Sequence, residues 1–232
     1  MKLIGIVGGL SWEATALYYR LLNQAAAREL GPHHNASSVI VSVDFAEALA
    51  LANAGDWDGL AVLLIDAARR TGDAGADMVL LAANTAHIVA EQVAAAIDVP
   101  LLHIADVAGA AAQMRGFCRV GLLGTRFTLE SPIYAERLRG RAGLSVIAPD
   151  AGARNELQRI IVEELTVGRV EPQSRQECST IIRRLRDEGA EAIIVACTEL
   201  PLLIRPEDSV LPLLDTTALH VEAALRLALG ND

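Results

Sequence analysis

The 232-residue chain has few features that would cross-link it or carry it into a membrane. Its three cysteines, Cys118, Cys178 and Cys197, are an odd number without CxxC spacing, which excludes a disulfide framework and a zinc site. The opening segment MKLIGIVGGLSWEA is broken by glycines and lacks a small-residue cleavage site. We therefore expect neither a signal peptide nor a membrane span, and we expect a cytoplasmic protein.

Positive charge and aromatic rings are also scarce. Twenty Lys and Arg stand against 29 Asp and Glu, a formal net charge of −9, and no basic cluster offsets it. This excludes nucleic acid and anionic membranes as partners and favours a small-molecule ligand. Aromatic residues make up only 3%, which argues against an all-β sandwich, whereas 52% hydrophobic residues are ample for a folded core.

Short apolar runs alternate with longer helical patterns along the chain. The alternation predicts an α/β fold with mainly parallel sheets flanked by helices, in which ligands bind outside the carboxyl ends of the strands. The predicted strands are Lys2–Val7, Ser38–Val43, Met78–Leu81, Leu101–Ile104, Val120–Leu123, Leu144–Ile147, Ala192–Val195 and Val210–Leu213. The predicted helices include Trp12–Leu30, Trp57–Thr71, Ala86–Ala96, Ala153–Val167, Gln173–Asp187 and Thr217–Leu229.

An internal repeat relates the two halves of the chain. Residues 69–80 align with residues 183–194 at an offset of 114, and the same offset places Ala83 on Cys197. GIVG at 5–8 aligns with GLLG at 121–124 at a similar offset. Either the chain is duplicated or it has two ordinary helix–turn–strand connections. We expect residues 1–104 plus 212–232 to form one α/β domain and residues 105–211 to form a second.

Polar residues at predicted strand ends are the candidate site. Cys197 comes directly after a buried strand and before a helical segment, where backbone N–H groups are expected to lower its thiol pKa and make it a base or nucleophile. Asn84, Thr85, Thr125 and Thr198 offer neutral donors that suit a carboxylate. Cys118 and Cys178 lack such neighbours, so we expect them to be buried hydrophobic residues.

Other strand-end residues have two open interpretations. Ser11 follows Gly8-Gly9, where it is either a hydroxyl donor to a small anion or a helix N-cap, and no GxGxxG or GxxxxGK[ST] motif indicates a nucleotide. His87 and His220 are either auxiliary catalytic groups or hydrogen-bonding groups. No HExxH motif is present, so no metal is expected.

Six segments together resemble the aspartate/glutamate racemase family. They span nearly the whole chain in order: GIVGGLSWEATALYYRLLN, SVDFAE, ANTAH, LLGTRFT, ACTELPLL and LLDTTALH. The resemblance implies two pseudo-symmetric α/β domains with the active site in the cleft between them. It also implies no cofactor, an amino acid or related carboxylate as substrate, and a homodimer.

The family's chemistry moves the α-proton of an amino acid between two cysteines on opposite faces of the substrate. Cys197 matches the second cysteine, but Ala83 stands where the first is expected, and a methyl group cannot carry a proton. Four explanations stay open: an engineered cysteine-to-alanine change at position 83, a natural one-thiol racemase, a single-cysteine decarboxylase or lyase like the arylmalonate decarboxylases, and a binding protein without turnover. Glu199 would tune or relay the thiol proton, although its charge would raise the thiol pKa.

The stretch after SVDF also departs from the family. Family members that handle aspartate or glutamate often carry an arginine there for the distal carboxylate, and residues 46–55 contain no cation. Unless Arg126 or Arg169 substitutes, we expect a substrate side chain with an uncharged or differently placed group. The leading prediction is a cofactor-independent amino-acid racemase with Cys197 as acid and base.

Overall fold

A computed structural model describes residues 1–230 of the protein, and the chain divides into two compact units. The first is Met1–Ile104 together with the segment from His220 onward, and the second is Ala105–Leu219. Residues 212–219 were expected with the first domain but lie with the second, because β7 (Leu213–Asp215) pairs with β6 (Ala192–Ala196). No helix in the described part of the chain is both long and apolar enough to cross a bilayer.

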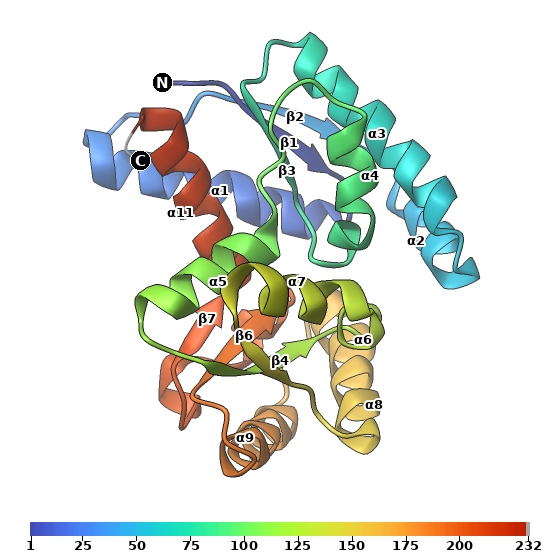
Figure 1. Cartoon of the computed structure of the whole chain (residues 1–232), viewed down its shortest axis with the longest axis vertical. Helices are drawn as coiled ribbons and strands as arrows, with labels where there is room; N and C mark the ends of the chain where they lie inside the picture. The colour runs from blue at the N-terminus through green and yellow to red at the C-terminus, as the bar shows by residue number, and fades with distance from the viewer. Residues whose placement is uncertain (231–232) are drawn as a thin grey trace. The chain divides into compact units, whose positions relative to one another are not determined.

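The first unit is a three-stranded parallel sheet with helices on both faces (Figure 1). Tyr18 and Leu22 pack on one face with residues 221–228, and Leu60 and Leu64 pack on the other face. The strands run in the order β2-β1-β3, with β1 (Ile4–Gly8), β2 (Ser38–Ser42) and β3 (Met78–Leu81). The helices are α1 (Trp12–Leu30), α2 (Phe45–Ala54), α3 (Trp57–Asp73), the 3-10 helix η1 (Thr85–Val89), α4 (Ala90–Ala95) and, beyond its first turn, α11 (Thr216–Leu229).

The second unit is a four-stranded parallel sheet in the order β5-β4-β6-β7. Its remaining strands are β4 (Arg119–Gly124) and β5 (Ser145–Ile147). Its α-helices are α5 (Ile104–Met114), α6 (Arg126–Glu130), α7 (Pro132–Ala142), α8 (Ala151–Arg159), α9 (Pro172–Asp187) and α10 (Leu200–Leu203). Its other helical turns are the π-helix η2 (Ile160–Glu164) and the 3-10 helices η3 (Leu165–Val167) and η4 (Pro206–Asp208). The expected mainly parallel α/β architecture is confirmed.

The strand registers confirm the internal repeat. Gly5 of β1 pairs with Val79 of β3, and Gly121 of β4 pairs with Ile193 of β6, so the two central strands have equivalent partners. Both glycines leave no room for a Cβ atom, which would lie 2.8 Å from Thr71 Oγ1 at Gly5 and 2.6 Å from Ile193 Cδ1 at Gly121. The repeated sequence therefore encodes the same strand and helix packing twice.

The strand predicted at 101–104 is wrong, the strand predicted at 210–213 is shifted, and two predicted helices change type. β7 shares only Leu213 with the predicted strand and continues to Asp215. The helix predicted over 86–96 begins as the 3-10 helix η1 before α4. Residues 101–104 form only an isolated bridge, Leu101 to Val79, before α5 begins at Ile104. The helix predicted over 153–167 is α-helical only as far as Arg159 and then continues as the π turn η2. Hydrophobic pattern alone does not distinguish a single bridge from a strand, or a π or 3-10 turn from an α-helix, because it reports periodicity and not the backbone hydrogen bonds.

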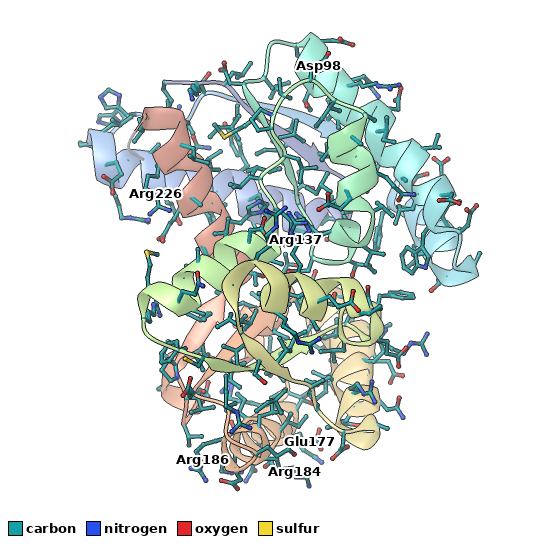
Figure 2. All side chains as sticks on the ribbon, viewed as in Figure 1. Asp98, Arg137, Glu177, Arg184, Arg186 and Arg226 are labelled. Carbon is teal, nitrogen blue, oxygen red and sulfur yellow. The ribbon has the colours of Figure 1, made fainter. Side chains whose placement is uncertain are left out.

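Ion pairs tie the helices of the second unit together. Arg137 of α7, labelled in Figure 2, donates to both carboxylate oxygens of Asp106 on α5 at 2.7 and 2.8 Å. Such a bidentate pair fixes orientation as well as distance.

Candidate active site

Cys197 and Ala83 occupy equivalent places in the two units. Ala83 comes shortly after β3, which pairs with β1, and Cys197 comes directly after β6, which pairs with the equivalent strand β4. Cys197 is 3% exposed and Ala83 is half-buried. The structure thus places both residues at carboxyl strand ends, as predicted, one in each unit. Carboxyl strand ends are where open parallel sheets bind ligands.

The Cys197 thiol is bonded to a carboxylate. Its Sγ donates to Glu199 Oε2 at 3.2 Å, and the Thr198 hydroxyl donates to the same oxygen at 2.6 Å. Burial and the negative charge of Glu199 raise the pKa of Cys197 well above its ordinary value, although backbone N–H groups of Glu199 and Leu200 oppose the rise. The predicted lowering of this pKa is wrong, because burial and Glu199 outweigh the amide donors.

This arrangement favours a resting thiol that donates its proton. A thiol beside a carboxylate keeps its hydrogen, whereas a nucleophilic cysteine is found beside cations. Glu199 accepts hydrogen bonds from both the Cys197 thiol and the Thr198 hydroxyl. The hydroxyl proton of Thr198 is therefore already bonded to Glu199. Cys197 is therefore best suited to protonating a carbanion.

Replacing Glu199 with glutamine is expected to lower the thiol pKa, because it removes the charge that disfavours the thiolate. Alkylation of Cys197 by iodoacetamide, followed by peptide mass spectrometry, should then reach its half-maximal rate at a lower pH. Cys178 is the internal control, since burial raises its pKa to about 12. An unchanged pH profile at Cys197 would contradict the role given to Glu199.

Several predicted site residues lie where a helix begins. Ser11 is the N-cap of α1, and its Oγ accepts from Ala14 N at 3.1 Å, which confirms the helix-capping alternative. Asn84 is buried and precedes η1, which begins at Thr85. In the second unit Thr125 precedes α6, and its hydroxyl lies 3.3 Å from Thr128 Oγ1. Asn84, Thr85 and Thr125 thus lie at carboxyl strand ends as predicted.

His87 and His220 belong to a buried aromatic cluster in the first unit. His87 Nδ1 donates to the Ala83 carbonyl at 2.9 Å, and its ring centroid lies 4.7 Å from His103 and 5.6 Å from His220. His220 Nε2 donates to the Leu102 carbonyl at 2.8 Å. Because a carbonyl only accepts, the Nδ1 atom of neutral His220 accepts from the Tyr18 hydroxyl, 3.0 Å away.

The cluster has a structural character. Burial, followed by the proximity of His87, lowers the pKa of His220 to about 3, so this imidazole stays neutral. Within residues 1–230, no three His, Cys, Asp or Glu side chains gather so that they could hold a metal ion. His87 therefore holds the main chain at Ala83, and His220 joins α11 to the segment before α5. Sequence reasoning missed His103 and Tyr18, because their contacts with His87 and His220 depend on tertiary packing.

The other two cysteines differ in their exposure to solvent. Cys178 is buried in α9 as expected, whereas Cys118 is exposed, so the prediction of a buried Cys118 is wrong. Cys118 lies just before β4, where its backbone N–H donates to Glu191 Oε2. The side chain of a residue at a strand entrance is not covered by the helices that flank the sheet.

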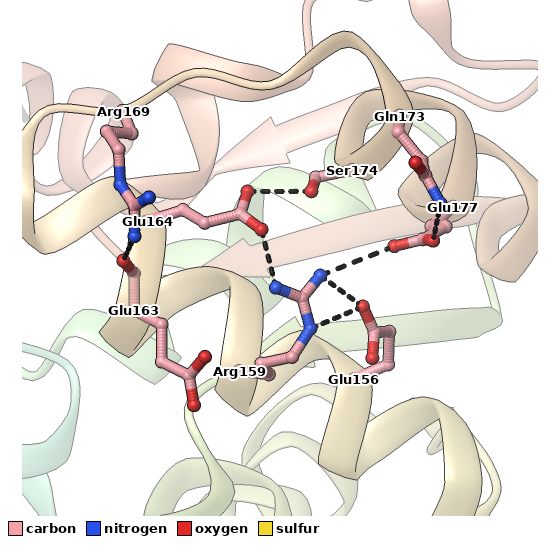
Figure 3. Close-up of polar contacts among 8 residues, drawn as sticks. All are labelled: Glu156, Arg159, Glu163, Glu164, Arg169, Gln173, Ser174 and Glu177. Carbon is pink, nitrogen blue, oxygen red and sulfur yellow. Dashed lines mark hydrogen bonds and ion pairs between the residues drawn. The ribbon is translucent and has the colours of Figure 1, made fainter.

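A cavity lies between α8 and α9. It has a volume of about 620 Å³, and its lining includes Glu156, Glu177 and Arg184. Figure 3 shows how its charges are paired nearby: Arg159 binds Glu156, Glu164 and Glu177, and Glu164 also accepts from the Ser174 hydroxyl at 2.6 Å. None of the predicted site residues lines this cavity. The network instead holds the π turn against α9.

The fold and strand-end chemistry define a class, a duplicated α/β protein with a thiol–carboxylate pair beside a parallel sheet. The model of the Asp/Glu/hydantoin racemase family matches residues 7–224. The chain therefore belongs to this family.

Solved structures and a curated relative agree with this assignment. A candidate Asp/Glu racemase from Yersinia pestis is 42% identical, with a TM-score of 0.94 over 99% of this chain and 100% of that one. An aspartate racemase homologue from Pyrococcus horikoshii OT3 is 34% identical, with a TM-score of 0.86 over 98% and 99% of the two chains. The broad specificity amino-acid racemase RacX of Bacillus subtilis (strain 168) is 30% identical over 166 residues, 70% of each protein.

Proposed function

We propose that the protein is a cofactor-independent enzyme that moves the α-proton of an amino acid, with Cys197 as acid and base. The observation that carries the proposal is the buried Cys197 thiol at the end of β6, 3.2 Å from the Glu199 carboxylate. Membership of a racemase family and the name of the relative RacX support an amino acid as substrate. We also propose a cytoplasmic location and a homodimer; the homodimer is proposed from the family resemblance alone.

The proton balance assigns the roles. When the substrate carbanion is protonated, the S–H bond of Cys197 breaks, a Cα–H bond forms and a thiolate remains. In the reverse direction that thiolate takes the α-proton. Asn84, Thr85 and Thr125 are proposed to hold the substrate carboxylate as it becomes enediolate-like, because donors aimed at developing charge stabilise a transition state. On the Ala83 face, water gives the second proton, so that an O–H bond breaks, a Cα–H bond forms and hydroxide remains, because the Ala83 methyl group has no proton to give.

The Cys197→Ala variant tests this proposal. We expect the exchange of α-protons for deuterium in D2O, followed by NMR over a panel of amino acids, to fall about 100-fold or more, the usual contribution of a positioned acid or base. Cys118→Ala is the matched control and should keep the wild-type rate, because Cys118 is exposed at the start of β4. Equal exchange by wild type and Cys197→Ala would overturn the proposal.

Ala83 favours a second candidate, a single-cysteine decarboxylase or lyase. In such a reaction CO2 leaves a substituted malonate, and the resulting enediolate needs a proton on one face only, which one thiol can supply. Release of CO2 from methylmalonate or phenylmalonate without any α-deuteration of amino acids would support this candidate. Deuteration of amino acids without CO2 release would exclude it.

A further inference from the structure

We infer that the hydroxyl of Thr217 binds the α-ammonium group of the amino-acid substrate, an inference that rests on the proposed function. Thr217 lies in the first turn of α11 and is completely buried. Within residues 1–230 its Oγ1 atom has no hydrogen-bond partner. The structure thus contains a buried polar atom that the described residues leave unsatisfied.

The other buried threonines behave differently. Thr216 Oγ1 donates to the Val195 carbonyl at 3.0 Å, and Thr71 Oγ1 donates to the Ala68 carbonyl at 2.7 Å. Thr15 also donates, to the Ser11 carbonyl, at 2.9 Å. Buried hydroxyl groups in proteins are paired as a rule, and valine would fill the same volume without an unsatisfied atom. A partner that is not part of the chain accounts for a threonine at this position.

Thr217 and Cys197 follow neighbouring strands of one sheet. Val195 of β6 pairs with Asp215 of β7, and Cys197 and Thr217 each follow that pair by two residues. Both residues therefore lie at the same edge of the same sheet. The first amides of α11 are already used, because Thr217 N and Ala218 N donate to Asp215 Oδ1 at 2.9 and 3.4 Å. The Thr217 hydroxyl, unlike these two amides, has no partner among the described residues.

The charges along this edge give the orientation of the ligand. β6, which Cys197 directly follows, lies between β4 and β7. Arg126 follows β4, whereas Asp215 ends β7. A zwitterionic amino acid with its Cα at the thiol therefore fits with its carboxylate toward β4 and its ammonium toward β7. There the Thr217 oxygen accepts a hydrogen bond from the ammonium next to the negative charge of Asp215.

Two threonine-to-valine variants, which keep the size of the side chain, test whether the Thr217 hydroxyl is hydrogen-bonded in the ligand-free protein. Thr217→Val should melt at or above the wild-type temperature, because it removes an unpaired hydroxyl. Thr216→Val should melt lower, because it removes the bond to Val195. If Thr217→Val melts as low as Thr216→Val, the hydroxyl is paired in the free protein and the inference is overturned.

Kinetics with alanine and propanoate test the ammonium contact. In Thr217→Val, the KM for L-alanine exchange in D2O should rise about 10- to 100-fold, the range for a hydrogen bond to a charged group. Inhibition by propanoate, which has no ammonium group, should stay the same, and Thr217→Ser should restore most of the affinity. An unchanged KM, or equal weakening of alanine and propanoate, overturns the inference.

Failure of the proposed function can be distinguished from failure of the Thr217 inference. If the wild-type protein exchanges no amino acid, or if Cys197→Ala exchanges as fast as wild type, the function fails whatever Thr217 does. The ammonium contact is then tested by ligand-dependent thermal stabilisation with alanine and propanoate, which needs no turnover. Stabilisation of Thr217→Val equal to that of wild type by alanine overturns the contact.

Discussion

Replacing Ala83 with cysteine is expected to raise the rate of two-way racemisation about 100-fold or more, because it adds a second acid–base group at the equivalent of Cys197. Ala83 is half-buried, so a side chain one sulfur atom larger needs little repacking. His87 bonds the main-chain carbonyl of residue 83, and a change of side chain leaves that contact in place. Both directions should be measured by polarimetry or chiral chromatography with the best amino acid of the panel.

The controls separate a second thiol from a change of shape. Ala83→Ser adds a group of similar size whose hydroxyl does not titrate in the range of a thiol, so it should give little gain. Cys197→Ala combined with Ala83→Cys should lose two-way racemisation again. If Ala83→Cys gives no gain, the protein is not a racemase that lacks one thiol, and the one-sided decarboxylase or lyase chemistry is favoured.

The unfolding free energy is expected to fall steeply between pH 6.5 and pH 3 because of His220. Burial and the neighbouring His87 lower its pKa from 6.5 to about 3 in the folded protein, although the bond to the Leu102 carbonyl opposes this shift. Between these two pH values the unfolded chain binds a proton that the folded chain does not. As the pH falls below 6.5, the unfolding free energy therefore decreases by about 1.4 kcal/mol per pH unit, to a total loss of about 5 kcal/mol near pH 3.

Urea unfolding between pH 7.5 and pH 4 measures this slope. His220→Gln should flatten the dependence by close to one proton, because glutamine does not titrate although its amide N–H group is able to donate to Leu102 O. Tyr18→Phe is the matched variant: it removes the hydroxyl that donates to His220 Nδ1, so it should lower stability but leave the slope in place. The same slope in His220→Gln and wild type would contradict the role of His220.

The local features of the site were predictable from the sequence. Cys197, Asn84 and Thr125 follow apolar runs that do form parallel strands, because a run of Val, Ile, Leu and Ala bounded by glycine is a strong strand signal. The repeat also predicted that Ala83 and Cys197 are equivalent, and the pairing of Gly5 with Val79 and Gly121 with Ile193 confirms it.

Electrostatic and long-range features were not predictable. The thiol pKa depends on how deeply Cys197 is buried and on where the Glu199 carboxylate points, and neither follows from the order of residues. The strand predicted at Leu101–Ile104 reduces to one bridge. His103 carries no local signal at all, since it meets His87 only through the fold.

The sequence alone determined the α/β class, the duplication, the family resemblance and the strand-end positions of the candidate residues, because these depend on local periodicity and spacing. Only the tertiary structure decided that Cys197 rests as a protonated thiol, that the histidines form a neutral buried cluster, and that Thr217 has an unsatisfied hydroxyl. Each of these depends on burial and on contacts between residues far apart in the chain or on side-chain direction, which residue spacing does not fix.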